Sequence, residues 1–155
     1  MKARLDFRNA SPAAGKAIGD LHAFVRRCGL EHGLLELIKL RASQINGCAH
    51  CIDMHTKELR AAGDSEQRLY LLDAWRESPF YSERERAALA WTEAVTLVTE
   101  GHVPDEVYAA ARAQFSEEEL VNLTTAVIAI NGANRLNIAF RTVPGSHQAE
   151  VRAAE

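Results

Sequence analysis

Helix-start signals recur along this chain, and they restrict what it can fold into. Ser82 precedes Glu85 by three residues and Ser116 precedes Glu119 by three, which is the capping-box pattern that opens a helix. Ser11-Pro12 adds a serine at the N-cap and a proline at the first helical position. No run alternates apolar and polar residues as a half-buried strand does. We therefore expect an all-α fold.

Glycine and proline residues separate the helical pattern into segments. Gly29, Gly63 and Gly101 each follow a helical stretch, Asn46-Gly47 is a stop and turn signal, and Pro144-Gly145 ends the last stretch. We expect a single-domain bundle of about six to seven helices over residues 1–145, and a polar tail at 146–155 that frays. The expected helices span residues 12–28, 31–45, 48–62, 66–75, 82–99, 104–114 and 116–140.

Composition and charge narrow the class of protein. The 155 residues suit one domain, and 47% of them are hydrophobic, which is enough for a core. The net charge of -3 comes from interspersed acidic and basic residues, without the basic face that nucleic-acid binding requires. No apolar run is long enough to span a bilayer, and the N-terminus lacks the apolar centre of a signal peptide. We therefore expect a cytoplasmic protein with no nucleic-acid or membrane partner.

The last expected helix is apolar on more than one side. Between Leu120 and Ile138, apolar residues occur all round the helix. A helix of this kind is buried in a protein interior. In a chain of 155 residues, part of that burial is expected to come from another subunit. The sequence therefore predicts a homo-oligomer.

Cys48, Cys51 and His55 form the motif with the strongest chemical implication. Positions three and four apart share one face of a helix, so the three side chains line up. The turn at Asn46-Gly47 places Cys48 at a helix start, where unpaired amides and the helix dipole stabilise a thiolate. Two cysteines that can close to a disulfide beside an imidazole are suited to thiol redox chemistry. His55 would take up the thiol proton.

Two other interpretations of this motif stay open. A zinc site would use Cys48 and Cys51 with one or both of His50 and His55, although structural zinc usually has four ligands and no second cysteine pair is present. Alternatively, the two cysteines are small apolar residues that are buried by coincidence. His50 flanks the motif from the edge between loop and helix. Cys28 lies outside it, and we expect it to take no part.

Glu36 is the third clue, because it stands in an otherwise apolar stretch. One interpretation is a surface pair with Lys39, three residues further on. The other is a partly buried carboxylate with a raised pKa that faces the next helix and holds or moves a proton. The two helices joined at Asn46-Gly47 must pack as neighbours, and an antiparallel hairpin brings Glu36 level with His55.

These residues together resemble the core motif of the alkylhydroperoxidase D (AhpD) family. The motif consists of Glu36, eleven intervening residues, and then Cys48-x-His50-Cys51-x-x-x-His55. The AhpD family belongs to the wider carboxymuconolactone decarboxylase-like superfamily. Two later segments, residues 75–86 and 116–137, are also similar to this family, so that the likeness covers most of the chain, from about residue 21 to residue 144.

The resemblance implies an oligomeric all-α peroxidase that reduces hydroperoxides with its dithiol. By position, Cys51 would attack the peroxide and Cys48 would resolve the resulting sulfenic acid. His55 and Glu36 would form a proton relay, and His50 would complete the site. A dithiol or thiol-protein reductant would reset the pair by exchange, and the scheme needs no metal or organic cofactor.

Two other functions are alternatives. Members of the superfamily that lack the cysteine pair act as decarboxylases on lactones, and such an enzyme would use His55 and Glu36 as acid and base. The presence of the pair argues against that branch. The other alternative is a non-enzymatic redox or metal sensor. Alkylation of the thiols distinguishes the lactone-processing enzyme from a thiol peroxidase, because lactone chemistry would survive it. Turnover of peroxide with a dithiol would count against the non-enzymatic sensor.

Overall fold

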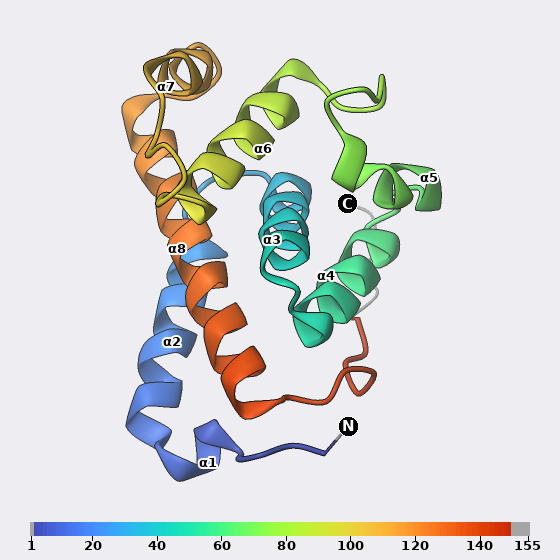
Figure 1. The fold of residues 1–155 in the computed structure, drawn as a ribbon, viewed down its shortest axis with the longest axis vertical. Coiled ribbons are helices and arrows are strands. Elements are labelled where there is room, and N and C mark those ends of the chain that lie inside the picture. The colour runs from blue at the N-terminus through green and yellow to red at the C-terminus, as the bar shows by residue number, and fades with distance from the viewer. Residues whose placement is uncertain (1, 150–155) are drawn as a thin grey trace.

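The computed structural model describes residues 2–149, and every regular element in this range is helical, as the sequence predicts. None of the helices in the described chain is both long and apolar enough to cross a membrane. Figure 1 shows their arrangement. The elements are α1 (Phe7–Ala10), α2 (Pro12–Val25), α3 (His32–Asn46), α4 (Ala49–Ala61), α5 (Glu66–Tyr70), the 3₁₀ turn η1 (Leu72–Ala74), α6 (Glu83–Thr96), α7 (Asp105–Arg112) and α8 (Glu117–Phe140).

Helix starts follow the signals in the sequence. Both capping boxes are formed: the side chain of Ser82 accepts from the N–H of Glu85, that of Ser116 accepts from the N–H of Glu119, and each glutamate returns a bond to the serine N–H. The short helix α1 was not expected. Its N-cap, Asp6, accepts two backbone N–H bonds, but four residues are too few to show helical periodicity.

Several expected helices are shorter than the sequence predicts, among them those expected at 12–28 and 104–114, which end at Val25 and Arg112. The segment expected at 66–75 divides into α5 and η1, because Leu71 departs from helical geometry between them. The helix expected at 82–99 ends at Thr96, and Leu97 is already non-helical. Helical periodicity reports which face is buried, and it does not resolve the last turn of a helix.

Helix α3 lies at the centre of the fold (Figure 1). It packs against α4, α6 and α8, while α2 lies along α8 and α7 contacts both α6 and α8. Every residue from Leu34 to Leu40 on α3 is buried, and two of them, Glu36 and Lys39, carry charges. A helix in this position brings those charges into the interior, next to α4.

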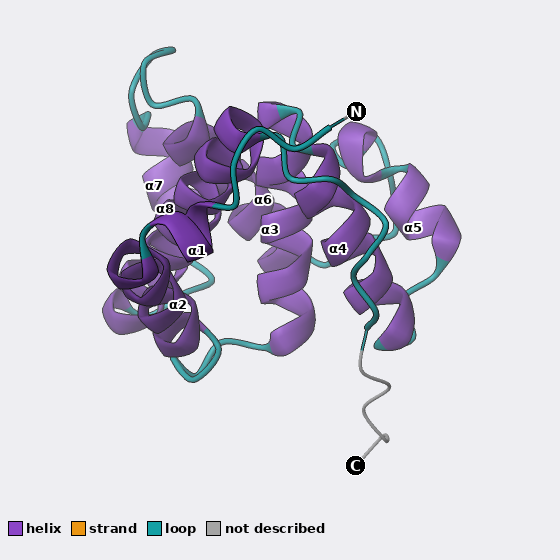
Figure 2. Ribbon diagram, turned by 90° about the horizontal axis from the view of Figure 1, so that it is seen from below, coloured by secondary structure: helices purple, strands orange, loops and turns teal. Residues whose placement is uncertain are grey.

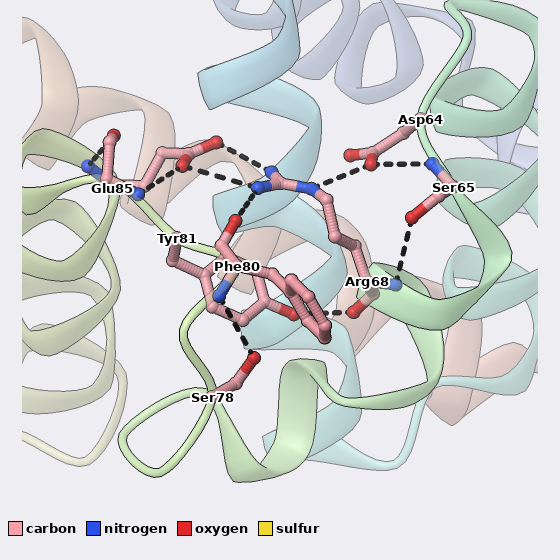
Figure 3. Close-up of polar contacts among 8 residues, drawn as sticks. Asp64, Ser65, Arg68, Ser78, Phe80, Tyr81 and Glu85 are labelled. Atoms are coloured by element: carbon pink, nitrogen blue, oxygen red, sulfur yellow. Dashed lines mark hydrogen bonds and ion pairs between the residues drawn. The ribbon is translucent and has the colours of Figure 1, made fainter.

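Polar contacts hold α5 against the start of α6 (Figure 3). The Arg68 guanidinium lies 2.7 Å from a carboxylate oxygen of Asp64 and 2.7 Å from one of Glu85, and it also donates to the carbonyl of Phe80. The second oxygen of Glu85 accepts from the N–H of Ser82, as the capping box requires. One glutamate therefore both caps α6 and anchors α5.

A tight turn and a C-terminal segment enclose α4. Gly47 has a φ of 68°, a left-handed conformation that ends α3 and turns the chain directly into α4. After α8, residues 142–149 run back along α4 (Figure 2). The N–H of Gly145 donates to Asp53, and the His147 ring lies 2.6 Å from a carboxylate oxygen of Glu58. The polar tail expected from residue 146 thus begins with residues that contact α4, and its residues 150–155 lie outside the described chain.

Candidate active site

The two motif cysteines lie together at the start of α4. Cys48 is the N-cap residue of α4 and Cys51 stands in its first turn, as the Asn46-Gly47 turn predicts. Both are free thiols and fully buried, with exposed fractions of 1% and 0%. They share a small apolar cluster with Ala42 of α3 and Ile130 of α8. The dithiol therefore lies where three helices meet.

Asparagines of α8 supply polar groups to the dithiol. The amide nitrogen of Asn137 lies 3.4 Å from the sulfur of Cys51. Asn134 is fully buried and donates to Ser43 at 3.1 Å, while its carbonyl oxygen accepts from Asn46 at 2.9 Å. The hydrogen bonds of Asn134 define the orientation of its amide, whereas the buried amide oxygen of Asn137 has no partner among the described residues.

The two thiols differ in their pKa. The neighbouring Cys51 thiol lowers the pKa of Cys48 to about 7, against the opposing effect of burial, and the amides of the first turn of α4 and Asn134 act in the same direction. The presence of Cys48 and burial together raise the pKa of Cys51. The two thiols therefore ionise as a coupled pair, in which Cys48 gives up its proton more readily than Cys51.

Glu36 and His55 meet across the α3–α4 hairpin, as the hairpin argument predicts. Oε2 of Glu36 lies 2.6 Å from Nδ1 of His55, and its Oε1 lies 2.6 Å from the ammonium of Lys39. The surface interpretation of the Glu36–Lys39 pair is wrong, because both side chains are only 7% exposed. The carboxylate therefore has two partners at once, one on its own helix and one on α4.

The expected rise in the pKa of Glu36 is also wrong. Burial alone would raise it, but the hydrogen bond from His55, the charge of His55 and the charge of Lys39 outweigh burial and bring the pKa of Glu36 to about 2. Burial lowers the pKa of His55 in spite of Glu36. The resulting state has an ionised Glu36, a protonated Lys39 and a neutral imidazole that donates from Nδ1–H to the carboxylate.

His55 lines a cavity, and its second nitrogen is unpaired. Among the described residues, Nε2 of His55 has no hydrogen-bond partner, although it is buried. His55, Glu36 and Asn137 contribute to the lining of a cavity of about 500 Å³, whose walls come mainly from α2, α3, α4 and α8. A neutral imidazole with an unpaired Nε2 is a proton acceptor, and this one belongs to a residue at the cavity wall.

His50 and a possible metal site were the remaining expectations. His50 lines the same cavity, half-buried, and its Nδ1 lies 3.3 Å from the carbonyl oxygen of Val143, so the ring contacts the C-terminal segment.

Within residues 2–149, no three or more His, Cys, Asp and Glu side chains are grouped so that they could hold a metal ion. The alternative zinc arrangement around Cys48 and Cys51 is therefore not found in the described chain.

The cavity includes residues that the sequence analysis did not single out. His22 of α2 lines it, and burial, together with the charges of Lys39, His55 and Arg26, lowers the pKa of His22 to about 4. Asn137 contacts Cys51 from α8. The sequence contains a signal for Asn137, because an amide side chain in an otherwise apolar helix is unusual. His22 stands in a helix with mixed polarity and had no comparable signal.

Comparison with known proteins identifies relatives of this chain. The model of the carboxymuconolactone decarboxylase family matches residues 12–94. YdfG of Bacillus subtilis (strain 168), described as an uncharacterized protein, is 42% identical over 140 residues, which make up 90% of this chain and 95% of YdfG.

Solved structures agree with this match. A protein of unknown function from Agrobacterium tumefaciens, described as a candidate antioxidant defence protein AhpD, has a TM-score of 0.91 and 49% identity, over 94% of this chain and 100% of the other. An AhpD-core, peroxidase-related protein from Ralstonia eutropha JMP134 shares the fold, with a TM-score of 0.79 at 20% identity over 90% and 75% of the two chains. With its AhpD-like fold, this chain belongs to the carboxymuconolactone decarboxylase family.

Proposed function

We propose that this protein is a thiol-dependent peroxidase that reduces hydroperoxides through a dithiol–disulfide cycle of Cys48 and Cys51. The observation that carries the proposal is a pair of free thiols on one helix with His55, Cys51 one turn before it and Cys48 two turns before it. The imidazole of His55 is held by the buried carboxylate of Glu36. The A. tumefaciens relative, described as a candidate antioxidant defence protein, is consistent with this chemistry.

The first step is attack of a thiolate on the peroxide. Cys51 passes its proton to Cys48 or to Nε2 of His55, and its sulfur attacks the hydroperoxide oxygen. The S–O bond forms as the O–O bond breaks, and the leaving alkoxide takes a proton to become an alcohol. Cys51 is then a sulfenic acid. Asn137, 3.4 Å from this sulfur, stabilises the negative charge that develops before attack.

The second step closes the disulfide. Cys48 becomes the attacking thiolate, and its proton goes to the departing hydroxide. Its sulfur attacks the sulfur of the sulfenic acid, the S–S bond forms, and hydroxide leaves with a proton as water. An external dithiol then reduces the disulfide by exchange and is itself oxidised. The net reaction turns one hydroperoxide and one dithiol into an alcohol, water and a disulfide.

Glu36 acts through His55 in this scheme. Its carboxylate accepts from Nδ1–H, which fixes the tautomer that leaves Nε2 free as the base. When Nε2 takes up a proton, the ionised Glu36 stabilises the imidazolium. Lys39 keeps Glu36 ionised, so the carboxylate remains an acceptor over the whole neutral range.

Thiol counting with peroxide tests the proposal. One equivalent of a hydroperoxide added to the reduced protein should remove two of the three thiols together, and a dithiol such as dithiothreitol should support turnover. Cys28→Ser is the matched control, because Cys28 lies outside the site, and it should leave the loss of two thiols unchanged. Thiols that survive the peroxide, or peroxide turnover that survives alkylation of the thiols, would contradict the proposal.

Single-cysteine variants test which sulfur attacks. Cys48→Ser should still form one sulfenic acid, which can be trapped by a dimedone-type reagent, and Cys51→Ser should form none. The reverse pattern would make Cys48, which has the lower pKa, the attacking residue and would exchange the two roles.

A further inference from the structure

One face of α2 forms a wall of the cavity. Gly15, Ile18, Gly19, His22 and Arg26 all line it, and their spacing places them on a single stripe of the helix. A Cβ atom built on Gly19 would meet no other atom within 4 Å. Because glycine is unfavourable inside a helix, the two glycines weaken α2 and leave free volume beside the reactive groups. This volume is suited to holding a ligand.

Two arginines bring positive charge to this cavity. Arg8 and Arg26 both line it, and within residues 2–149 neither has a carboxylate partner. Arg68, in contrast, is engaged by the carboxylates of Asp64 and Glu85 (Figure 3). The third cation of the cavity, Lys39, is already neutralised by Glu36. The cavity therefore presents two guanidinium groups whose charge is not compensated by the protein.

Part of the cavity lining is apolar. Ile18, Met54, Ile130, Ala133 and Leu136 contribute to it, from α2, α4 and α8. The volume of the cavity, about 500 Å³, is within the range of small-molecule sites. A lining that combines apolar side chains with guanidinium groups fits an amphipathic molecule.

The arginines lie near opposite ends of α2, with His22 between them. Arg8 belongs to α1, and the Cβ position of Gly15 in α2 is 3.4 Å from its backbone, while Arg26 is the C-cap of α2. At 1.5 Å per residue, Gly15 lies about 10 Å before His22 and Arg26 lies about 6 Å after it along the helix. Both arginines and His22 line the same cavity as His55, so a ligand in this cavity has a guanidinium group and the site histidine in its wall.

On the basis of the proposed peroxidase function, we infer that the substrate is an organic hydroperoxide that carries a carboxylate. Its apolar chain lies along Ile18, Gly19 and Met54, and its carboxylate pairs with Arg8 or Arg26. Its hydroperoxide group lies beside His55 and Asn137, and Asn137 in turn contacts the sulfur of Cys51. Guanidinium groups recognise carboxylates through charged, often bidentate hydrogen bonds, which neutral hydroperoxides cannot form. Reduction then yields the corresponding hydroxy acid and water.

A matched pair of substrates tests this inference. A hydroperoxy fatty acid and its methyl ester differ only in the negative charge. The wild-type protein should show a KM about tenfold lower for the acid. The double variant Arg8→Ala/Arg26→Ala should raise the KM for the acid about tenfold with little change in kcat, and should leave the ester unaffected. The single variants show which arginine contributes more.

Arg27→Ala is the matched control. Arg27 is exposed and adjacent to Arg26 but does not line the cavity. Its removal lowers the charge of the protein by one, as each single variant does, and should not change either KM. Equal KM values for acid and ester in the wild-type protein, or an equal loss in Arg27→Ala, would overturn the substrate inference and leave the peroxidase proposal intact.

Binding without turnover separates the two proposals. If neither hydroperoxide is reduced, the proposed function fails, and calorimetric titration with octanoate and with octan-1-ol decides the inference alone. Octanoate should bind, octan-1-ol should bind at least tenfold more weakly, and the double arginine variant should lose this preference. Equal affinity for the two probes, or no octanoate binding, would overturn the inference.

Discussion

The ammonium of Lys39 lies 2.6 Å from a carboxylate oxygen of Glu36, and both side chains are in the protein interior, 7% exposed. The other carboxylate oxygen is held by His55. Lys39 keeps this carboxylate ionised but does not contact Nε2 of His55, which has no hydrogen-bond partner among the described residues. Lys39 is therefore a positioning residue for the site. Its pairing also means that any change at Glu36 affects the stability of the fold.

Loss of Lys39 should destabilise the protein strongly. Lys39→Met leaves Glu36 buried without its cation, and we expect the free energy of unfolding to fall by about 3–5 kcal/mol. Lys16→Met is the matched control, because Lys16 pairs with Asp20 on the exposed surface, where a pair contributes about 0.2–1 kcal/mol. Urea denaturation of both variants measures the difference. Equal losses would show that the interior pair is not different from the exposed one.

The Cys51 thiol should control the acidity of Cys48. Cys51→Ala removes its main stabilising neighbour and should raise the pKa of Cys48 from about 7 toward that of an ordinary thiol. Cys51→Ser keeps a hydrogen-bond donor at the same place and should raise it less. Thiolate absorbance in the ultraviolet, followed against pH, measures both variants. The same pKa of Cys48 in the two variants would exclude hydrogen bonding from residue 51 as the cause.

His22 should make the fold sensitive to mild acid. Burial lowers the pKa of this histidine from 6.5 to about 4, so between these values the unfolded chain binds a proton that the folded chain does not. Stability should therefore fall as the pH decreases from 6.5 to about 4. His22→Gln should reduce the slope in this window, as measured by urea denaturation at a series of pH values, and the part that remains is expected from His55, whose pKa burial also lowers.

Glu36 should make the stability depend on pH in a lower pH range than His22 does. Its pKa is lowered from 4.5 to about 2, so its contribution is complete above 4.5 and is lost as the pH falls toward 2. The His22→Gln variant should therefore keep the steep loss below pH 4.5. An unchanged slope between pH 6.5 and about 4 in His22→Gln would show that another group titrates there.

Gly19 should set the size of molecule that the cavity accepts. Gly19→Ala adds a methyl group where no atom lies within 4 Å, and should stabilise α2 by about 0.5–1 kcal/mol. Gly19→Leu should fill the cavity and slow the reduction of bulky hydroperoxides, while hydrogen peroxide is reduced at the wild-type rate. Gly33→Leu is the control, since Gly33 is also helical and open but lies outside the cavity. Equal slowing for hydrogen peroxide would indicate damage to the dithiol itself.

We also predict assembly into a homo-oligomer through α8. Val121 and Ile128 are two turns apart on this helix and are 65% and 55% exposed in the single chain. Ile128→Glu should weaken the assembly, whereas Tyr70→Glu, on the exposed surface of α5, should not. Light scattering measures both, and a wild-type mass near 17.1 kDa at micromolar concentration would contradict the prediction.

The elements of this fold are largely predictable because their ends are marked by local chemistry. Ser82 and Ser116 open α6 and α8 through bonds within one helical turn, and Gly47 ends α3 by its left-handed conformation. Such signals depend only on neighbouring residues. The short α1 lacks periodicity and depends on Asp6, so it could not be inferred from the pattern.

The site is predictable only where its parts lie close in sequence. Cys48, Cys51 and His55 share one helix, and Glu36 is joined to them by a tight turn, so helical geometry is sufficient to bring them together. The sequence does not show whether Glu36 is buried. A glutamate and a lysine three residues apart on a helix have the same spacing whether the pair lies on the surface or in the interior. His22 and Asn137 reach the site only through long-range packing.

The contact between Asn137 and Cys51 joins residues that are 86 positions apart in the chain. At the usual rate of synthesis, about 5–20 residues per second, α8 follows the dithiol out of the ribosome by roughly 4–17 s. During that interval α3 and α4 can already pair, but the cysteines lack the cover that α8 provides. A nascent chain of this protein therefore holds its two motif thiols without the cover of α8 until the segment around Asn137 has left the ribosome.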